Sequence, residues 1–205
     1  MMVSTAPMLL AFVLCASATT VCLYLGRFAF DYSEDQHPYK DTGFIAAPDW
    51  SHVMWPNYVV AAFHGALVLF LVFAHTSRAV LLRRLLFLWA ITQLIQTLQN
   101  CVTRLPDPNE HLRNRTWHYT MYPVQYMVGA SFFHFYCSHR LLNAFAWLVS
   151  IFGMMLLIPT HAFYTVGVLS GAFAGTLPCF VYHWYVRTST SIGKRWYLRW
   201  FEYDA

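Results

Sequence analysis

Six apolar stretches, each about long enough to cross a lipid bilayer, constrain this sequence more than any other feature. A helix needs about 20 mainly apolar residues to span the hydrocarbon core of a membrane. Hydrophobic residues make up 58% of the 205 residues and charged residues 11%, whereas a soluble domain carries about 25% charged residues. We therefore predict an all-α, polytopic membrane protein with a single domain over residues 1–205. The predicted transmembrane helices cover residues 8–29, 57–75, 82–102, 121–138, 142–160 and 163–186.

Details of these stretches refine the prediction. We interpret the first as a membrane helix rather than a signal peptide, because no Lys or Arg precedes its apolar run Pro7–Cys15. The fourth is aromatic and contains His134, so the sequence leaves open whether it spans completely. The short connector Pro159–Ala162 predicts that the last two helices form an antiparallel pair. Small residues, among them Gly129 and Gly171, predict close helix contacts within the chain or with a partner.

The charges of the loops predict the orientation of the helices. With six helices, both termini lie on the same side as the loops after the second and fourth helices. That side carries eight Lys and Arg residues and the other side five. Because Lys and Arg are enriched in cytoplasmic loops, we predict that both termini face the cytosol or an equivalent compartment such as the mitochondrial matrix.

Three short motifs occur in a fixed order along the chain. Ala47-Pro48-Asp49-Trp50-Ser51-His52 precedes the second helix, and Val102-Thr103-Arg104-Leu105-Pro106-Asp107-Pro108 closes the third. Thr160-His161-Ala162-Phe163-Tyr164-Thr165-Val166-Gly167-Val168 opens the sixth. Together these motifs resemble the sphingomyelin synthase family, within the type-2 phosphatidic acid phosphatase superfamily. The resemblance implies six transmembrane helices and transfer of a lipid phosphoryl group, in which one His attacks and a second His is oriented by an Asp.

The residues that the resemblance makes responsible for catalysis are largely replaced. Tyr164-Thr165-Val166 sets the register, which puts Phe163 and Gly167 where the family has the base His and its Asp. Neither residue can accept or orient a proton. The nearest counterpart of the nucleophile is His118, and the Ser and Gly that precede it in the family are absent. We therefore expect no catalytic residues and predict a non-catalytic, lipid-binding accessory subunit of a larger membrane complex, derived from a lipid phosphotransferase.

Two alternative functions stay open at this point. One is an active lipid phosphotransferase or phosphatase with a rearranged site, built from His118, His161 and either Asp49 or Asp107. The other is a membrane electron carrier that binds haem between two histidines, His64 and His134, which both lie inside apolar helices. Outside the haem alternative, we expect no cofactor and no metal.

Basic and aromatic residues at helix ends form a candidate lipid-binding set. Such residues suit anionic headgroups, including those of cardiolipin, although ordinary anchoring at the membrane boundary explains them equally well. We expect phospholipids and other membrane subunits as partners, and no nucleic acid. A respiratory or ATP synthase complex of the mitochondrial inner membrane is favoured over a Golgi or endoplasmic reticulum location. The lipid-binding candidates are Arg83, Arg84, Lys194, Arg195, Arg199, Trp184 and Trp196.

Overall fold

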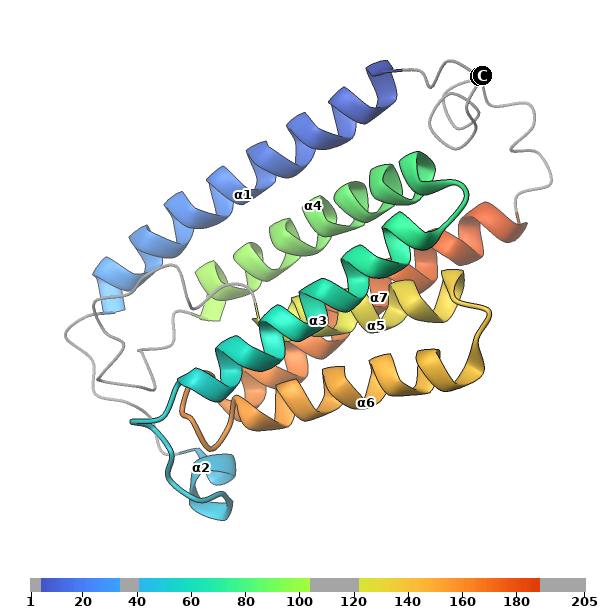
Figure 1. The fold of residues 1–205 in the computed structure, drawn as a ribbon. Coiled ribbons are helices and arrows are strands. Elements are labelled where there is room, and N and C mark those ends of the chain that lie inside the picture. Colours follow the sequence, from blue (N-terminus) through green and yellow to red (C-terminus); the bar gives the residue numbers. More distant parts are fainter. Residues whose placement is uncertain (1–4, 34–40, 104–121, 189–205) are drawn as a thin grey trace.

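All of the regular structure in the described part of the chain is helical. The computed structural model describes residues 5–33, 41–103 and 122–188, and no strand occurs in those ranges. Figure 1 shows the helices as an elongated bundle in which the long helices run nearly parallel or antiparallel. In chain order, the helices are α1 (Thr5–Ser33), α2 (Thr42–Ala46), α3 (Trp55–Ala74), α4 (Arg78–Thr103), α5 (Tyr122–Tyr136), α6 (Arg140–Leu156) and α7 (Thr165–Thr188).

The all-helical prediction is confirmed, because each of the six predicted stretches overlaps one of these helices. Four described helices contain a segment that is long and apolar enough to cross a membrane: Thr5–Leu25, Trp55–Ala74, Arg78–Gln99 and Thr165–Arg187. α5 and α6, with 15 and 17 residues, are shorter than the roughly 20 residues of a typical span. The chain is thus an all-helical protein with four candidate membrane-spanning helices, and the six-span topology stays a prediction.

α5 is the innermost helix of the bundle. It packs against α3, α4, α6 and α7, and every residue from 126 to 133 is buried. α6 and α7 run antiparallel, as predicted, but both pack mainly on α5 rather than on each other. The aromatic composition of α5 therefore reflects its central position in the core, where Tyr126, Phe132 and Phe133 are buried.

Glycines let the neighbouring helices approach α5 closely. A Cβ atom at Gly175 of α7 would lie 2.6 Å from the backbone oxygen of Val124. One at Gly153 of α6 would lie 2.7 Å from the ring of Tyr126. Gly129 of α5 itself lies directly against the His64 ring of α3. The close helix contacts predicted from small residues are therefore confirmed within the chain.

Large apolar side chains cover the outer faces of α1, α3, α6 and α7. Phe12, Phe73, Leu148 and Phe173 are examples, one on each of these helices, and each is mostly exposed. A soluble monomer rarely exposes contiguous apolar surface on this scale, whereas lipid acyl chains are a suitable solvent for it. The surface therefore agrees with the composition in indicating an integral membrane protein.

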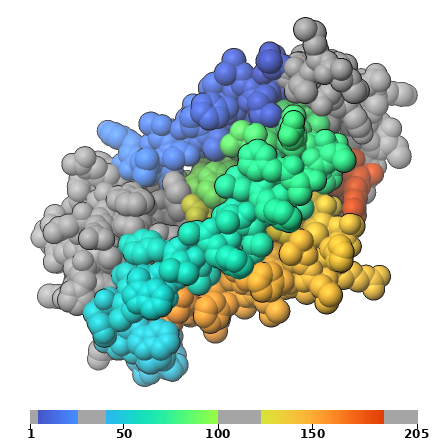
Figure 2. Space-filling view, viewed as in Figure 1, coloured from blue at the N-terminus to red at the C-terminus, as the bar shows by residue number. Residues whose placement is uncertain are grey.

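α1 lies at the edge of the bundle. It packs chiefly on α4. Its buried residues Pro7, Ala11, Ala18 and Cys22 are small and spaced by four, seven and four positions, so they form one face of the helix. Neither of the two hydrophobic core clusters contains a described residue of α1. Figure 2 shows α1 as a ridge along one edge of the molecule.

Candidate functional site

The loop before α3 lies against the connector between α6 and α7, and together they form one end of the bundle. The amide of Trp50 donates to the carbonyl oxygen of Pro159 at 2.8 Å. The side-chain nitrogen of Asn57 donates to the hydroxyl of Thr160, also at 2.8 Å, and both side chains are buried. Two of the three sequence motifs, 47–52 and 160–168, meet in space at this end, where Asp49 of the first lies 3.9 Å from His161 of the second. We call this end the acidic end, because Asp41 and Asp49 both lie there.

Asp41 joins α2 to α7. One carboxylate oxygen accepts the amide of Gly43 at 2.7 Å and the hydroxyl of Thr165 at 2.7 Å, and the other accepts the amide of Thr165 at 2.6 Å. Burial raises the pKa of this carboxyl, but the three hydrogen bonds outweigh that effect and hold the pKa below its ordinary value. Asp41 thus supplies an acceptor for the otherwise unpaired amide at the start of α7.

His161 lies between an aromatic ring and a carboxylate. Its ring stacks on Phe44 with centroids 4.2 Å apart, and its Nε2 lies 3.9 Å from a carboxylate oxygen of Asp49. The φ angle of His161 is 51°, in the left-handed region that His adopts more often than most residues do. The amide and hydroxyl of Ser51, followed by the nearby His161 and His52, hold the pKa of Asp49 below its ordinary value.

The Asp49–His161 contact brings together two residues of the predicted rearranged site. The distance of 3.9 Å is too long for a hydrogen bond, and the Asp49 side chain is 70% exposed. Asp49 therefore does not fix the orientation of the imidazole in the way a catalytic dyad requires. The other two residues of that predicted site, His118 and Asp107, lie outside the described residues, as does the spacing between His118 and His161.

The two positions that the resemblance assigns to the base and its carboxylate are apolar in their surroundings. Phe163 is 8% exposed and belongs to a hydrophobic cluster that also contains Leu157 and Val168. A Cβ atom at Gly167 would meet only the ring of Phe163, at 3.8 Å. A packed phenyl ring therefore occupies the position that the resemblance assigns to the base.

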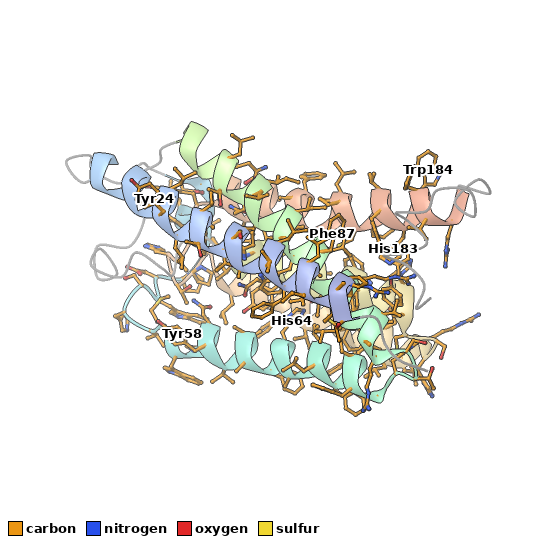
Figure 3. All side chains as sticks on the ribbon, turned by 90° about the horizontal axis from the view of Figure 1, so that it is seen from above. Tyr24, Tyr58, His64, Phe87, His183 and Trp184 are labelled. Atoms are coloured by element: carbon orange, nitrogen blue, oxygen red, sulfur yellow. The ribbon has the colours of Figure 1, made fainter. Side chains whose placement is uncertain are left out.

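Arginines gather at the opposite end, which we call the arginine end. Arg83 is 1% exposed, although it carries a charge. Arg84 donates to the hydroxyl of Tyr136 at 3.1 Å, and the same hydroxyl lies 2.7 Å from Nε2 of His183. Trp184 is exposed and points away from the bundle, whereas the neighbouring His183 lies on the inner side of α7 (Figure 3). The remaining lipid-binding candidates, Lys194, Arg195, Arg199 and Trp196, lie outside the described residues.

The two histidines of the haem alternative lie in different surroundings. His64 is buried on α3, where its ring meets Tyr126 edge-on with centroids 5.2 Å apart. His134 is exposed on α5 and stacks on Phe180 of α7 at 5.5 Å. The His64 ring thus faces the interior of the bundle, whereas the His134 ring lies on its surface. Among the described residues, no group of three His, Cys, Asp or Glu side chains is arranged to hold a metal ion.

Asp41, Asn57, Tyr136 and His183 were not predicted as site residues. A local signal existed for Asp41, because Asp-Thr-Gly is a typical start of a short helix. No local pattern pointed to the others, since their partners are distant in sequence, as the Arg84–Tyr136 separation of 52 positions illustrates.

Comparison with known proteins adds no assignment to this geometry. The sequence matches no protein-family model and no curated protein.

Proposed function

We propose that this chain is a non-catalytic, lipid-binding helical subunit of a larger membrane complex, descended from a lipid phosphotransferase. The observation that carries the proposal is Phe163, a packed phenyl ring at the position that the sphingomyelin synthase resemblance assigns to the base. Loss of one member of a catalytic triad lowers the rate by about 10⁴-fold or more. Gly167 removes a second member, because it has no side chain that can orient a base.

The proposed topology has six membrane-spanning helices with both termini on the side of the arginine end. Arginines at the boundary of a cytoplasmic or matrix face agree with the positive-inside rule. For the short helix α6, the exposed apolar residues Leu148 and Phe152 support contact with lipid. α5 is surrounded by other helices, so its 15 residues need not match the bilayer by themselves.

The proposed location is the mitochondrial inner membrane, in a respiratory or ATP-synthesising complex. The glycosylation sequon Asn114-Arg115-Thr116 offers a test that distinguishes this location from a membrane of the secretory pathway. In the proposed topology the sequon lies on the non-cytosolic side, where a secretory membrane protein would be accessible to glycosylation. The protein from native membranes is expected to keep its mass after treatment with a glycosidase.

The proposal is tested by purification of the full chain from its native membrane in a mild detergent. We expect it to migrate with other membrane subunits and to show no headgroup transfer from phosphatidylcholine or phosphatidylinositol above a protein-free control. A stable monomer with measurable turnover would overturn the proposal.

A second function, an active phosphotransferase with a rearranged site, is favoured by one observation, the proximity of His161 to Asp49. In that case turnover would be lost in His161→Ala and in His118→Ala. His139→Ala is the matched control, because His139 lies just before α6, at the arginine end. Equal turnover in all three variants would exclude the rearranged site.

A further inference from the structure

A shallow groove runs between α3 and α6 on the outside of the bundle. The two helices lie side by side on the face of the molecule seen in Figure 2. The groove has a volume of about 330 Å³, which is at the lower end of the range for ligand-binding pockets. We call it the α3–α6 groove, and its lining residues are Val59, Val60, Phe63, Leu148, Val149 and Phe152.

Exposed walls flank a half-buried floor in this groove. Val60 and Val149 are half-buried, whereas the other four lining residues are 47–65% exposed. On one side, the ring of Phe63 meets Phe145 edge-on with centroids 6.0 Å apart. Because α6 begins at the arginine end, Phe145 lies on the arginine-end side of the groove. The groove is therefore closed on that side and opens outward and toward the acidic end.

The groove faces the hydrocarbon of the membrane in the proposed topology. α3 is a candidate membrane-spanning segment from Trp55 to Ala74. Val59 and Phe63 follow Trp55 by four and eight residues, so they lie about 6 and 12 Å along the helix from its start. None of the lining side chains has a polar group, so a water-soluble ligand would find no hydrogen-bonding partner among them. The groove therefore suits an apolar occupant.

The size of the lining side chains distinguishes between two apolar occupants, a helix of another protein and an acyl chain. Membrane helices pack closely where small residues let their backbones approach. This chain uses small residues in that way inside its own bundle, where Gly153 of α6 lies against the ring of Tyr126. The groove is lined instead by valine, leucine and phenylalanine side chains, which keep a partner backbone at a distance. A thin and flexible acyl chain fits between them.

We propose that the α3–α6 groove binds an acyl chain of a membrane phospholipid in the leaflet at the acidic end. Lipid tails are as apolar as the groove, so binding comes from close dispersion contacts with the walls rather than from the release of water. The proposal deepens the proposed lipid-binding function and rests on it. It predicts that the protein recognises the chain with little dependence on the headgroup.

The experiment uses the full-length chain, purified and reconstituted into vesicles of dioleoyl phosphatidylcholine. A small fraction of the phosphatidylcholine carries a photoreactive diazirine in one acyl chain, and labelled residues are mapped by mass spectrometry after irradiation. Leu169 and Phe173 are the comparison, because they are exposed, lie outside the groove, and follow the start of α7 by the same four and eight residues.

We expect the lining residues to be labelled about fivefold more than Leu169 and Phe173, a preference that corresponds to about 1 kcal/mol. α7 also starts at the acidic end, so the two sets of residues lie at similar distances from that end of the bundle. Equal labelling of both sets overturns the proposal, because the lipid then only surrounds the protein.

A substitution that covers the groove provides a second test. Leu148→Trp places a larger ring on a wall of the groove and is expected to lower labelling of the other lining residues about fivefold. Leu169→Trp is the matched control, because it makes the same change at a similarly exposed position on α7, and it should alter groove labelling by less than about twofold. Thermal unfolding checks that both variants fold. Unchanged labelling in a folded Leu148→Trp protein overturns the proposal.

Two further outcomes concern the identity of the occupant. Dioleoyl phosphatidylglycerol with the same photoreactive chain is expected to give the same labelling, and labelling with this anionic lipid alone overturns recognition of the chain. A photoreactive amino acid at position 148 should form an adduct with lipid in the native membrane, whereas an adduct with another polypeptide overturns the acyl chain as occupant.

These results are distinguishable from a failure of the proposed function. Loss of the labelling preference without headgroup turnover leaves the non-catalytic subunit standing. Turnover with an intact labelling preference overturns only the non-catalytic assignment.

Discussion

At the scale of the residue, Asp41 is the side chain through which α2 and α7 are joined. In Asp41→Asn, the amide group that replaces the second oxygen presents N–H donors to the amide of Thr165, which is itself a donor. We expect a loss of about 1 kcal/mol, comparable with the loss of a helix cap, and a melting temperature about 2–4 °C lower at pH 7. Thermal unfolding in detergent measures the change.

The contribution of Asp41 also depends on pH, with a defined sign. Its folded pKa lies below the ordinary value, so its stabilising effect is complete above the unfolded pKa of about 3.9 and is lost as pH falls through the folded pKa. The difference in the free energy of unfolding between the wild type and Asp41→Asn should therefore shrink as the pH falls below about 4. A difference that grows on acidification would contradict the interpretation.

The contact between Gly129 and His64 makes a second prediction at this scale. Gly129→Ala places a methyl group in the space of the His64 ring, and overpacking of this kind costs about 1–3 kcal/mol. Gly65→Ala is the matched control, because a Cβ atom there meets nothing within 4 Å. Chemical or thermal unfolding should show that Gly129→Ala is much less stable than Gly65→Ala. If His64→Ala in the same chain does not relieve the loss, the clash is not its cause.

At the scale of the element, the pairing of α5 and α7 depends on a glycine that faces backbone. A methyl group in Gly175→Ala would lie 2.6 Å from the carbonyl oxygen of Val124, which cannot rotate away as a side chain can. The two helices must then separate, and we expect a loss of about 1–3 kcal/mol. Gly167→Ala on the same helix adds only an ordinary contact at 3.8 Å to Phe163. Equal thermal stability of the two variants would show that the approach at Gly175 can relax.

The helices themselves could be predicted from the sequence, whereas their arrangement could not. Apolar runs of 20 residues specify a membrane helix almost regardless of context, and this is why α3 and α4 begin within four residues of the predicted positions. The central position of α5 depends on contacts with four other helices, which a local pattern does not encode. The sequence predicted that α6 and α7 run antiparallel, but it did not predict that α5 contacts both of them.

The candidate site could likewise be predicted from the sequence only in part. Asp49 and His161 were both singled out from motifs, and they lie together at the acidic end. Their relation to Asp41 could not be predicted, because its bond to Thr165 joins positions 124 apart. At the other end, Arg84 was predicted from its charge and place, but the role of Tyr136 depends on three helices meeting at one hydroxyl group.

At the scale of the whole molecule, the proposed topology puts the acidic and arginine ends on opposite sides of the membrane. The prediction is tested with His52→Cys and Ser138→Cys, both exposed positions, each in a chain without other cysteines. A maleimide that does not cross membranes should label Ser138→Cys from the cytosolic or matrix side and His52→Cys from the other. Labelling of both from one side would contradict the six-span arrangement.

The peripheral place of α1 has a consequence for the order of assembly during translation. α1 leaves the ribosome first, yet its main packing partner, α4, begins only at Arg78. In the proposed topology, α1 stays in the bilayer without its main packing partner until α4 is inserted, which its apolar surface allows. Its small-residue face at Ala11, Ala18 and Cys22 then receives α4, while α5, α6 and α7 are still to be made. In this topology, the integration of α1 does not depend on the core around α5, which is completed later in the chain.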